Sequence, residues 1–141
     1  MNLSEKDPAT AMPSAELDAR LATEVMGWRW DYTRAVWDTL PRIVGGIYRP
    51  RTSSELETGE HHLRLDWSPS TNAAHAGELR RKANDWSLAR GPGGVYALVR
   101  HEGAEGSSPV LFTETDGDKA AAEALAVCRA WLAALKARDK V

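Results

Sequence analysis

A pair of short strands joined by a glycine-rich turn constrains the fold of this chain more than any other feature. Residues 86–90 and 95–99 alternate their side chains with the two-residue period of β-strands, and Gly-Pro-Gly-Gly at 91–94 joins them. A four-residue connection is too short for a crossover, so the strands are predicted to pair as an antiparallel hairpin. After a polar loop at 102–108, a third strand is predicted at 110–113. The chain is therefore expected to contain an antiparallel sheet.

Three helices are predicted around these strands, at about residues 15–26, 71–83 and 117–137. Ser14 and Ser70 are typical N-cap residues for the first two helices. The third helix has small and apolar side chains at i, i+3 and i+4 spacing. Acidic residues at its start and basic residues at its end suit the helix dipole. Together these elements predict an α+β fold, in which helices pack on an antiparallel β-sheet.

The stretch between the first two helices has weaker patterns. Residues 42–49 (RIVGGIYR) are predicted to form a strand that a pair of glycines interrupts, as in a β-bulge. Residues 62–66 (HLRLD) alternate polar and apolar side chains, which favours another short strand. Both segments are expected to add short strands to the fold.

Length and composition favour a single domain. The chain has 141 residues, of which 43% are hydrophobic and 27% are charged, and these values are close to globular averages. Residues 1–13 are polar, contain two prolines and lack periodicity. They are predicted to be a disordered leader before one α+β domain at 14–141.

Charge and cysteine content restrict the partners and the location. The formal net charge of −2 disfavours a nucleic-acid partner, because phosphate backbones favour a strongly basic surface. The single cysteine, Cys128, excludes an intrachain disulfide and suits the reducing cytoplasm of a bacterial host cell. The sequence contains no apolar run of the length that a signal peptide or a membrane span needs. A cytoplasmic protein without a membrane partner is expected.

Four segments of the chain resemble a known protein family. Their sequences, in chain order, are ELDARLATEVMGW (16–28), SPSTNAAHAGEL (68–79), WSLARGPGGVYALVRHEG (86–103) and ALAVCRAWLAALKA (124–137). They resemble the opening helix, the start of the second helix, the hairpin and the closing helix of the phage ABA-sandwich domain proteins. The resemblance covers roughly residues 15–137. It implies a small phage or prophage protein with helices on both faces of a sheet, an α-β-α sandwich, and it supplies no catalytic residue.

No arrangement of residues in the sequence predicts catalysis, a metal or a cofactor. His61 and His62, near Asp66, have the side chains of metal ligands, but adjacent residues on a strand point to opposite faces, which favours a solvated strand edge. Cys128 lies on the apolar face of the last helix and is interpreted as a core residue. The turn at 91–94 lacks the phosphate-loop pattern. The protein is expected not to be an enzyme and to have no cofactor.

Tryptophans and interleaved arginines are the candidates for a binding surface. Six tryptophans occur in the chain, and three of them fall close together between the first predicted helix and the first predicted strand. Trp and Arg are enriched at the centres of protein interfaces, and the same mixture suits a nucleotide-like ligand. The residues predicted to bind a partner protein are Trp28, Trp30, Trp37, Arg34, Arg42 and Arg49.

Two functions remain open at this point. The first is a non-catalytic binding protein, a phage accessory factor that engages a host protein and inhibits, for example, a defence protein. A homodimer is compatible with this function. The second is an RNA-binding module, because residues 71–137 have the α–β–β–β–α order of double-stranded-RNA-binding domains. Residues 115–118 read Thr-Asp-Gly-Asp at the start of the last helix, where carboxylates repel phosphate, so the first function is favoured.

Overall fold

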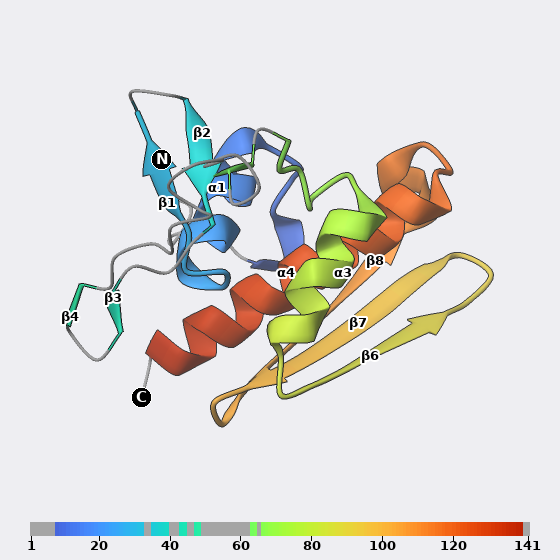
Figure 1. The fold of residues 1–141 in the computed structure, drawn as a ribbon. Helices are drawn as coiled ribbons and strands as arrows, with labels where there is room; N and C mark the ends of the chain where they lie inside the picture. Colours follow the sequence, from blue (N-terminus) through green and yellow to red (C-terminus); the bar gives the residue numbers. More distant parts are fainter. Residues whose placement is uncertain are drawn as a thin grey trace.

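The computed structural model describes residues 8–32, 35–39, 43–44, 47–48, 63–64 and 66–139 (Figure 1). Its helices, two of them short 3-10 helices, are η2 (Pro8–Thr10), α1 (Ala15–Glu24), α3 (Ala73–Lys82), η3 (Phe112–Thr115) and α4 (Lys119–Asp139). Its strands are β1 (Arg29–Asp31), β2 (Val36–Asp38), β3 (Ile43–Val44), β4 (Ile47–Tyr48), β5 (Leu63–Arg64), β6 (Asp85–Arg90), β7 (Gly94–His101) and β8 (Ala104–Leu111). All strand pairs among the described residues are antiparallel, and the predicted α+β class is confirmed.

The predicted hairpin forms the first two strands of the larger sheet, whose order is β6-β7-β8. Arg90 pairs with Val95, so residues 91–94 lie between this pair, as the sequence predicts. Gly94 is already the first residue of β7, where it pairs with Leu111. The sheet therefore begins where the strand periodicity and the glycine-rich turn place it.

The third strand is longer than predicted, because β8 includes most of the expected loop at 102–108. A tight turn joins β7 to β8. Glu102 and Gly103 in this turn have φ values of 50° and 82°. Two successive positive φ values are typical of the hairpin turn whose twist matches the flanking strands. The predicted start at residue 110 is therefore wrong: β8 begins directly after this turn.

α4 packs along one face of the larger sheet (Figure 1). The β7 side chains Val95, Ala97 and Val99 are buried on this face, whereas Tyr96 on the other face is exposed. Gly106 in β8 allows the helix to come close, because a Cβ at this position would overlap the backbone of α4. Close packing of backbone on backbone thus explains a glycine within a strand.

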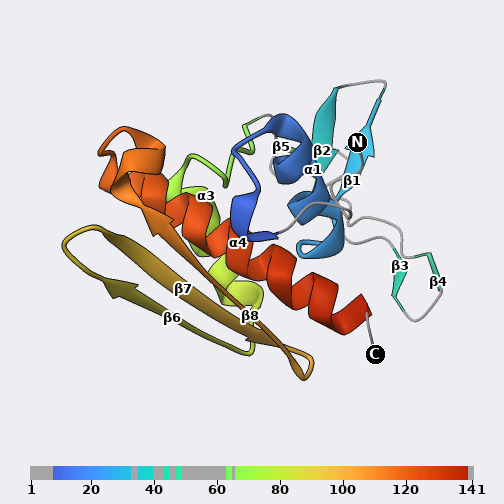
Figure 2. The ribbon, with the colours of Figure 1, turned by 180° about the vertical axis from the view of Figure 1, so that it is seen from behind.

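α4 is the middle layer of the molecule. α3 lies beside it, and the indole Nε1 of Trp131 in α4 donates a hydrogen bond of 3.1 Å to the carbonyl oxygen of Leu79 in α3. Figure 2 shows α1 and the strands β1 and β2 on the side of α4 that faces away from β6-β7-β8. A helix covered on both sides is apolar around most of its circumference, as α4 is from residue 122 to residue 135.

This arrangement differs from the expected α-β-α sandwich. Among the described residues, α3 and α4 share one face of the larger sheet, and the other face carries exposed side chains such as Tyr96 and Leu111. The pattern of β7 did not decide this, because apolar residues occur on both of its faces. α4 provides the larger apolar surface and is therefore enclosed between the sheet and α1.

Residues 8–13 do not behave as part of a disordered leader. Ala11 is buried, and its carbonyl oxygen accepts a hydrogen bond of 2.8 Å from Nε of Arg129 in α4. A buried guanidinium needs such acceptors, and the segment that includes η2 supplies one. The predicted boundary at residue 13 is therefore too late in the chain, and residues 1–7 lie outside the described part.

The helices begin and end within two residues of their predicted bounds. Ser14 caps α1 as predicted, and its hydroxyl accepts a hydrogen bond of 3.0 Å from the backbone nitrogen of Leu17. α3 is capped by Asn72 instead of Ser70. The side-chain oxygen of Asn72 accepts hydrogen bonds from two backbone N–H groups of the first turn. Asn is an equally good cap. The backbone nitrogen of Ser70 instead donates a hydrogen bond to Asp18.

The short strands complete the fold. Within the segment predicted as one interrupted strand, the described residues 43–44 and 47–48 are two strands, β3 and β4, which pair with each other, Ile43 opposite Tyr48. A pair of glycines favours a tight connection between strands, and the two glycines here lie outside the described residues. β5 lies within the predicted strand at 62–66 and pairs with β2, which separates it from β1 in the sheet order β1-β2-β5.

Candidate functional site

A pocket of about 580 Å³ opens between α1 and the small β1-β2-β5 sheet. This volume is in the range of pockets that enclose a small molecule, and it is large enough for a partner's side chain. Aromatic rings form much of its wall. Its lining residues are Ala15, Asp18, Ala19, Trp30, Tyr32, Trp37, Trp67 and Ser68. We call this cavity the aromatic pocket.

Trp30 and Trp37 form one corner of the aromatic pocket. They are directly opposite each other on β1 and β2. Their ring centroids are 5.0 Å apart and their planes meet at 68°, which is an edge-to-face contact. Trp37 is 8% exposed and Trp30 is 37% exposed. One ring is therefore fixed in the core, and the other is partly open to a ligand.

Trp67 is held in place on three sides. Its Nε1 donates a hydrogen bond of 2.8 Å to the carbonyl oxygen of Asp18. Its ring stacks on His75, with centroids 5.6 Å apart, and meets the edge of Trp28 at 4.5 Å. These contacts fix the ring before any ligand arrives, which reduces the entropy that binding costs.

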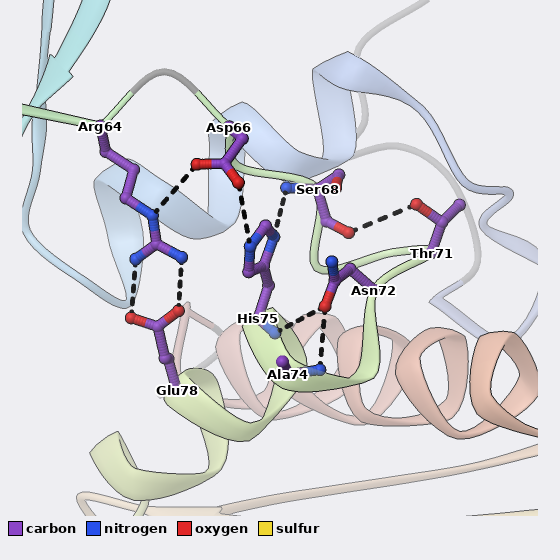
Figure 3. Close-up of polar contacts among 8 residues, drawn as sticks. All are labelled: Arg64, Asp66, Ser68, Thr71, Asn72, Ala74, His75 and Glu78. Atoms are coloured by element: carbon purple, nitrogen blue, oxygen red, sulfur yellow. Dashed lines mark hydrogen bonds and ion pairs between the residues drawn. The ribbon is translucent and has the colours of Figure 1, made fainter.

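Arg64, which lies over the Trp67 ring, forms a forked ion pair with Glu78 (Figure 3). The two terminal nitrogens of Arg64 lie 2.8 and 2.7 Å from the carboxylate oxygens of Glu78. The guanidinium of Arg64 is also 5.5 Å from the centroid of the Trp67 ring. The hydrogen bond from Arg64 lowers the pKa of Glu78, so this carboxylate stays ionised and keeps the guanidinium in position.

His75 connects α3 to the segment that carries Trp67. Its Nδ1 accepts a hydrogen bond of 3.0 Å from the backbone nitrogen of Ser68, and its Nε2 is 3.8 Å from a carboxylate oxygen of Asp66 (Figure 3). Because Nδ1 accepts, the ring proton is on Nε2. The backbone of Ser68 makes the hydrogen bond to the ring, so this trio does not have the hydroxyl-to-imidazole geometry of a nucleophilic triad.

Asp18 places a carboxylate in the wall of the aromatic pocket. Its side chain is 7% exposed, and its Oδ1 accepts a hydrogen bond of 2.9 Å from the backbone nitrogen of Ser70. Burial raises the pKa of Asp18 above its ordinary value, and the hydrogen bond from Ser70 acts in the opposite direction. Within the part of the chain that the structure describes, Asp18 is the one lining residue with a carboxylate, and no Lys, Arg or His belongs to the lining.

A smaller hollow of about 320 Å³ lies next to the loop at 91–94 on the larger sheet. The only charged side chain in its lining is Arg90, which already forms an ion pair of 2.5 Å with Glu123. Backbone, apolar side chains and the exposed ring of Tyr96 form the rest of its wall. Because this hollow is smaller and its charged side chain is already paired, the aromatic pocket is the stronger candidate.

The residues that the sequence predicts for binding do not all lie in the aromatic pocket. Trp30 and Trp37 both line the aromatic pocket. Trp28 is buried and supports Trp67 from outside the lining. The arginines predicted with them, Arg34, Arg42 and Arg49, lie outside the described residues.

The sequence analysis missed Asp18 and Trp67, the two buried residues that connect α1 to the pocket. The spacing of residues in α1 could have indicated Asp18. Leu21 and Ala22 follow it by three and four residues, so all three share the buried face of the helix. A carboxylate on an apolar helix face is unusual and points to a specific role. Trp67 carries no such signal, because its neighbours in the pocket are distant in sequence.

Within the described residues, no group of three or more His, Cys, Asp or Glu side chains is close enough to hold a metal ion. His61 and His62 lie outside the described part. Cys128 is fully buried, and burial raises its pKa well above the ordinary value, as in a core thiol. None of the helices, over the same residues, is long and apolar enough to cross a membrane.

Comparison with known proteins finds no family model, no curated protein and no solved structure that matches this chain. The similarity to phage ABA-sandwich proteins thus stays an expectation from the four sequence segments.

Proposed function

We propose that this protein is a non-catalytic binding protein and that the aromatic pocket holds an anchoring group of its partner. The observation that carries the proposal is a preformed cavity with three tryptophans in its wall. Large aromatic side chains dominate the energy of protein interfaces when they line or fill a pocket. Trp67 is already fixed by Asp18, His75 and Trp28, so little ordering is needed on binding.

The chemistry of the lining favours binding over catalysis. Its polar side chains are Asp18, Ser68, the phenol of Tyr32 and the indole N–H groups. Acid–base catalysis by two carboxylates needs a second acidic group, and nucleophilic catalysis needs a base that contacts a hydroxyl or thiol. His75 contacts the backbone of Ser68 instead. These facts support a role in recognition.

The partner that we propose is a protein of a bacterial host. The basis is the resemblance to small phage proteins, together with the aromatic pocket, whose rings suit an anchor from another protein. Inhibition of a host defence protein is the specific form of this role that the resemblance suggests. The pocket would then cover a surface or a side chain that the host protein needs.

The test is affinity capture from a bacterial lysate with tagged protein, with and without nuclease. Trp30→Ala and Tyr32→Ala remove exposed walls of the pocket, and Tyr32 is 88% exposed, so neither change should unfold the protein. Trp86→Ala is the matched control, since Trp86 is 43% exposed and lies on β6, outside the pocket. A host protein that both pocket variants lose and the control keeps would support the proposal. Equal capture by all three variants would contradict it.

RNA binding is the second candidate, because α3, β6, β7, β8 and α4 follow the order of double-stranded-RNA-binding domains. The charges at the start of α4 oppose it. Asp118 caps the helix: its Oδ1 accepts a hydrogen bond of 3.1 Å from the backbone nitrogen of Ala121, so its carboxylate is fixed there. We expect labelled duplex RNA to migrate unchanged with this protein at physiological salt. A retarded band that high salt abolishes would favour RNA.

A further inference from the structure

We infer that the aromatic pocket recognises an alkylated ammonium cation, such as a trimethylammonium group, held between its tryptophan rings and the carboxylate of Asp18. This inference rests on the proposed binding function and specifies the chemistry of the anchor. The group could belong to a methylated lysine of a partner protein or to a free small molecule. The shared chemistry is a cation surrounded by methyl groups.

The arrangement of the rings fits a rounded ligand better than a flat one. Trp30 and Trp37 meet at 68° and form a corner, whereas a nucleobase is held best between or against parallel rings. Tyr32 and Trp67 contribute further aromatic surface to the same cavity. The face of an aromatic ring carries negative partial charge and attracts a cation next to it.

The charge of the lining has the sign that a cation needs. Among the described residues, Asp18 has the only carboxylate in the wall, and it forms no ion pair with a described Lys, Arg or His. Its Oδ1 takes a hydrogen bond from Ser70, and a charge that is 7% exposed interacts strongly with an opposite charge nearby. A phosphate-bearing nucleotide would face repulsion from the same carboxylate.

The cationic residues near the pocket do not cancel this attraction. Arg64 lies over the Trp67 ring, but it is outside the lining, and its charge is neutralised by Glu78 through two hydrogen bonds. Asp66 adds a second carboxylate at 3.7 Å from Arg64. His75 stacks behind Trp67, outside the lining, and accepts a hydrogen bond at Nδ1 from the backbone nitrogen of Ser68.

Alkyl groups on the cation match the rest of the wall. Ala15 and Ala19 add apolar surface, and few hydrogen-bond acceptors are present to replace the water around a bare ammonium. A methylated ammonium is less strongly hydrated and contacts the rings through its methyl groups. The pocket therefore favours the alkylated form over free lysine or ammonium.

The buried carboxylate of Asp18 lowers the stability of the fold, which fits a functional role. The pKa of Asp18 is raised because burial opposes its charged form, so ionised Asp18 destabilises the fold at neutral pH. Asp18→Asn keeps an acceptor for the Ser70 N–H and removes this charge. We expect the variant to be at least as stable as the natural protein and yet to lose affinity for the cation. A purely structural carboxylate would not show this opposite pair of effects.

The test compares the affinities of choline and of 3,3-dimethyl-1-butanol, its neutral carbon isostere, as measured by calorimetry and tryptophan fluorescence. We expect choline to bind more tightly by about tenfold. Asp18→Asn and Trp30→Ala should each weaken choline binding by about tenfold, whereas the matched controls Asp85→Asn and Trp86→Ala should leave it unchanged. Equal affinity for the two probes, no effect of Asp18→Asn, or tighter binding of adenosine monophosphate than of choline would overturn the inference.

A peptide with one trimethylated lysine identifies the source of the cation. If it binds more tightly than choline and than its unmodified form, the anchor comes from a protein. If choline binds and the peptide is excluded, the ligand is a free small cation. Both results support the cation site. In the capture experiment, loss of the partner with Trp30→Ala but not with Asp18→Asn would overturn the cation inference and leave the proposed function intact.

Discussion

Arg129 of α4 donates its Nε–H to the carbonyl oxygen of Ala11 across 118 residues of chain, at 2.8 Å. The guanidinium is 1% exposed, and a second nitrogen lies 3.1 Å from a carboxylate oxygen of Glu114 in η3. A buried charge is tolerated only when it is paired and hydrogen-bonded. One side chain of the central helix therefore fixes both the N-terminal segment and the connection between β8 and α4.

We predict that Arg129→Ala lowers the free energy of unfolding by about 3 kcal/mol, because it leaves a buried carbonyl and a cavity behind. Urea denaturation measures the change. Arg138→Ala is the control: Arg138 is an exposed arginine in the last turn of the same helix, and its removal should cost about 0.5 kcal/mol or less. Similar losses in the two variants would show that residues 8–13 do not pack on α4 in solution.

A second prediction concerns the close packing of α4 on β8 at Gly106. A Cβ at this position would overlap the backbone of Ala130 and Ala134, so Gly106→Ala must push the helix away from β8. We expect a loss of about 2 kcal/mol or more in thermal or urea unfolding. Gly93→Ala is the control, because its Cβ would meet nothing within 4 Å and its φ is not positive. A harmless Gly106→Ala would contradict this helix–strand contact.

Local signals in the sequence predicted the helices and the first hairpin, because caps, periodicity and the glycine-rich turn act over a few residues. β8 was missed over most of its length, since Gly106, Ser107, Ser108 and Pro109 are weak strand formers. Tertiary contacts override this preference. α4 requires the glycine, and β8 is an edge strand, where proline is tolerated.

The candidate site was predictable only in part for a related reason. The close spacing of tryptophans indicated Trp30 and Trp37, which one strand pair brings together. Trp67 and Asp18 meet them through folding of distant segments, and a single sequence gives no sign of that contact. The order of the layers was likewise undecided, because β7 has apolar residues on both faces.

Cys128 provides a probe of the core in which it lies. It is fully buried between apolar residues of α4, and burial raises its pKa, so the native thiol is neither exposed nor ionised. We expect it to resist a thiol reagent at mildly alkaline pH and to react completely in denaturing urea. The rate under native conditions should follow unfolding of the core. Fast, complete labelling of the native protein would place the thiol at the surface.

Glu78 links stability to pH through its ion pair with Arg64. The hydrogen bond from Arg64 lowers the pKa of Glu78 from its ordinary value of 4.5. A carboxylate with a lowered folded-state pKa stabilises the fold above the unfolded-state value, and this contribution is lost as the pH falls through the folded-state value. We therefore expect Glu78→Gln to lower the free energy of unfolding by about 1 kcal/mol at neutral pH.

The difference between Glu78→Gln and the natural protein should shrink below a pH of about 4.5 and disappear in stronger acid, as followed by urea denaturation across this range. The raised pKa of Asp18 acts in the opposite direction, but it is present in both proteins and cancels in the comparison. Glu105→Gln, which breaks the exposed pair with Arg100, is the control and should have a smaller effect at neutral pH. A difference that does not change with pH would mean that Arg64 is held by its stacking on the tryptophans and not by the charge of Glu78.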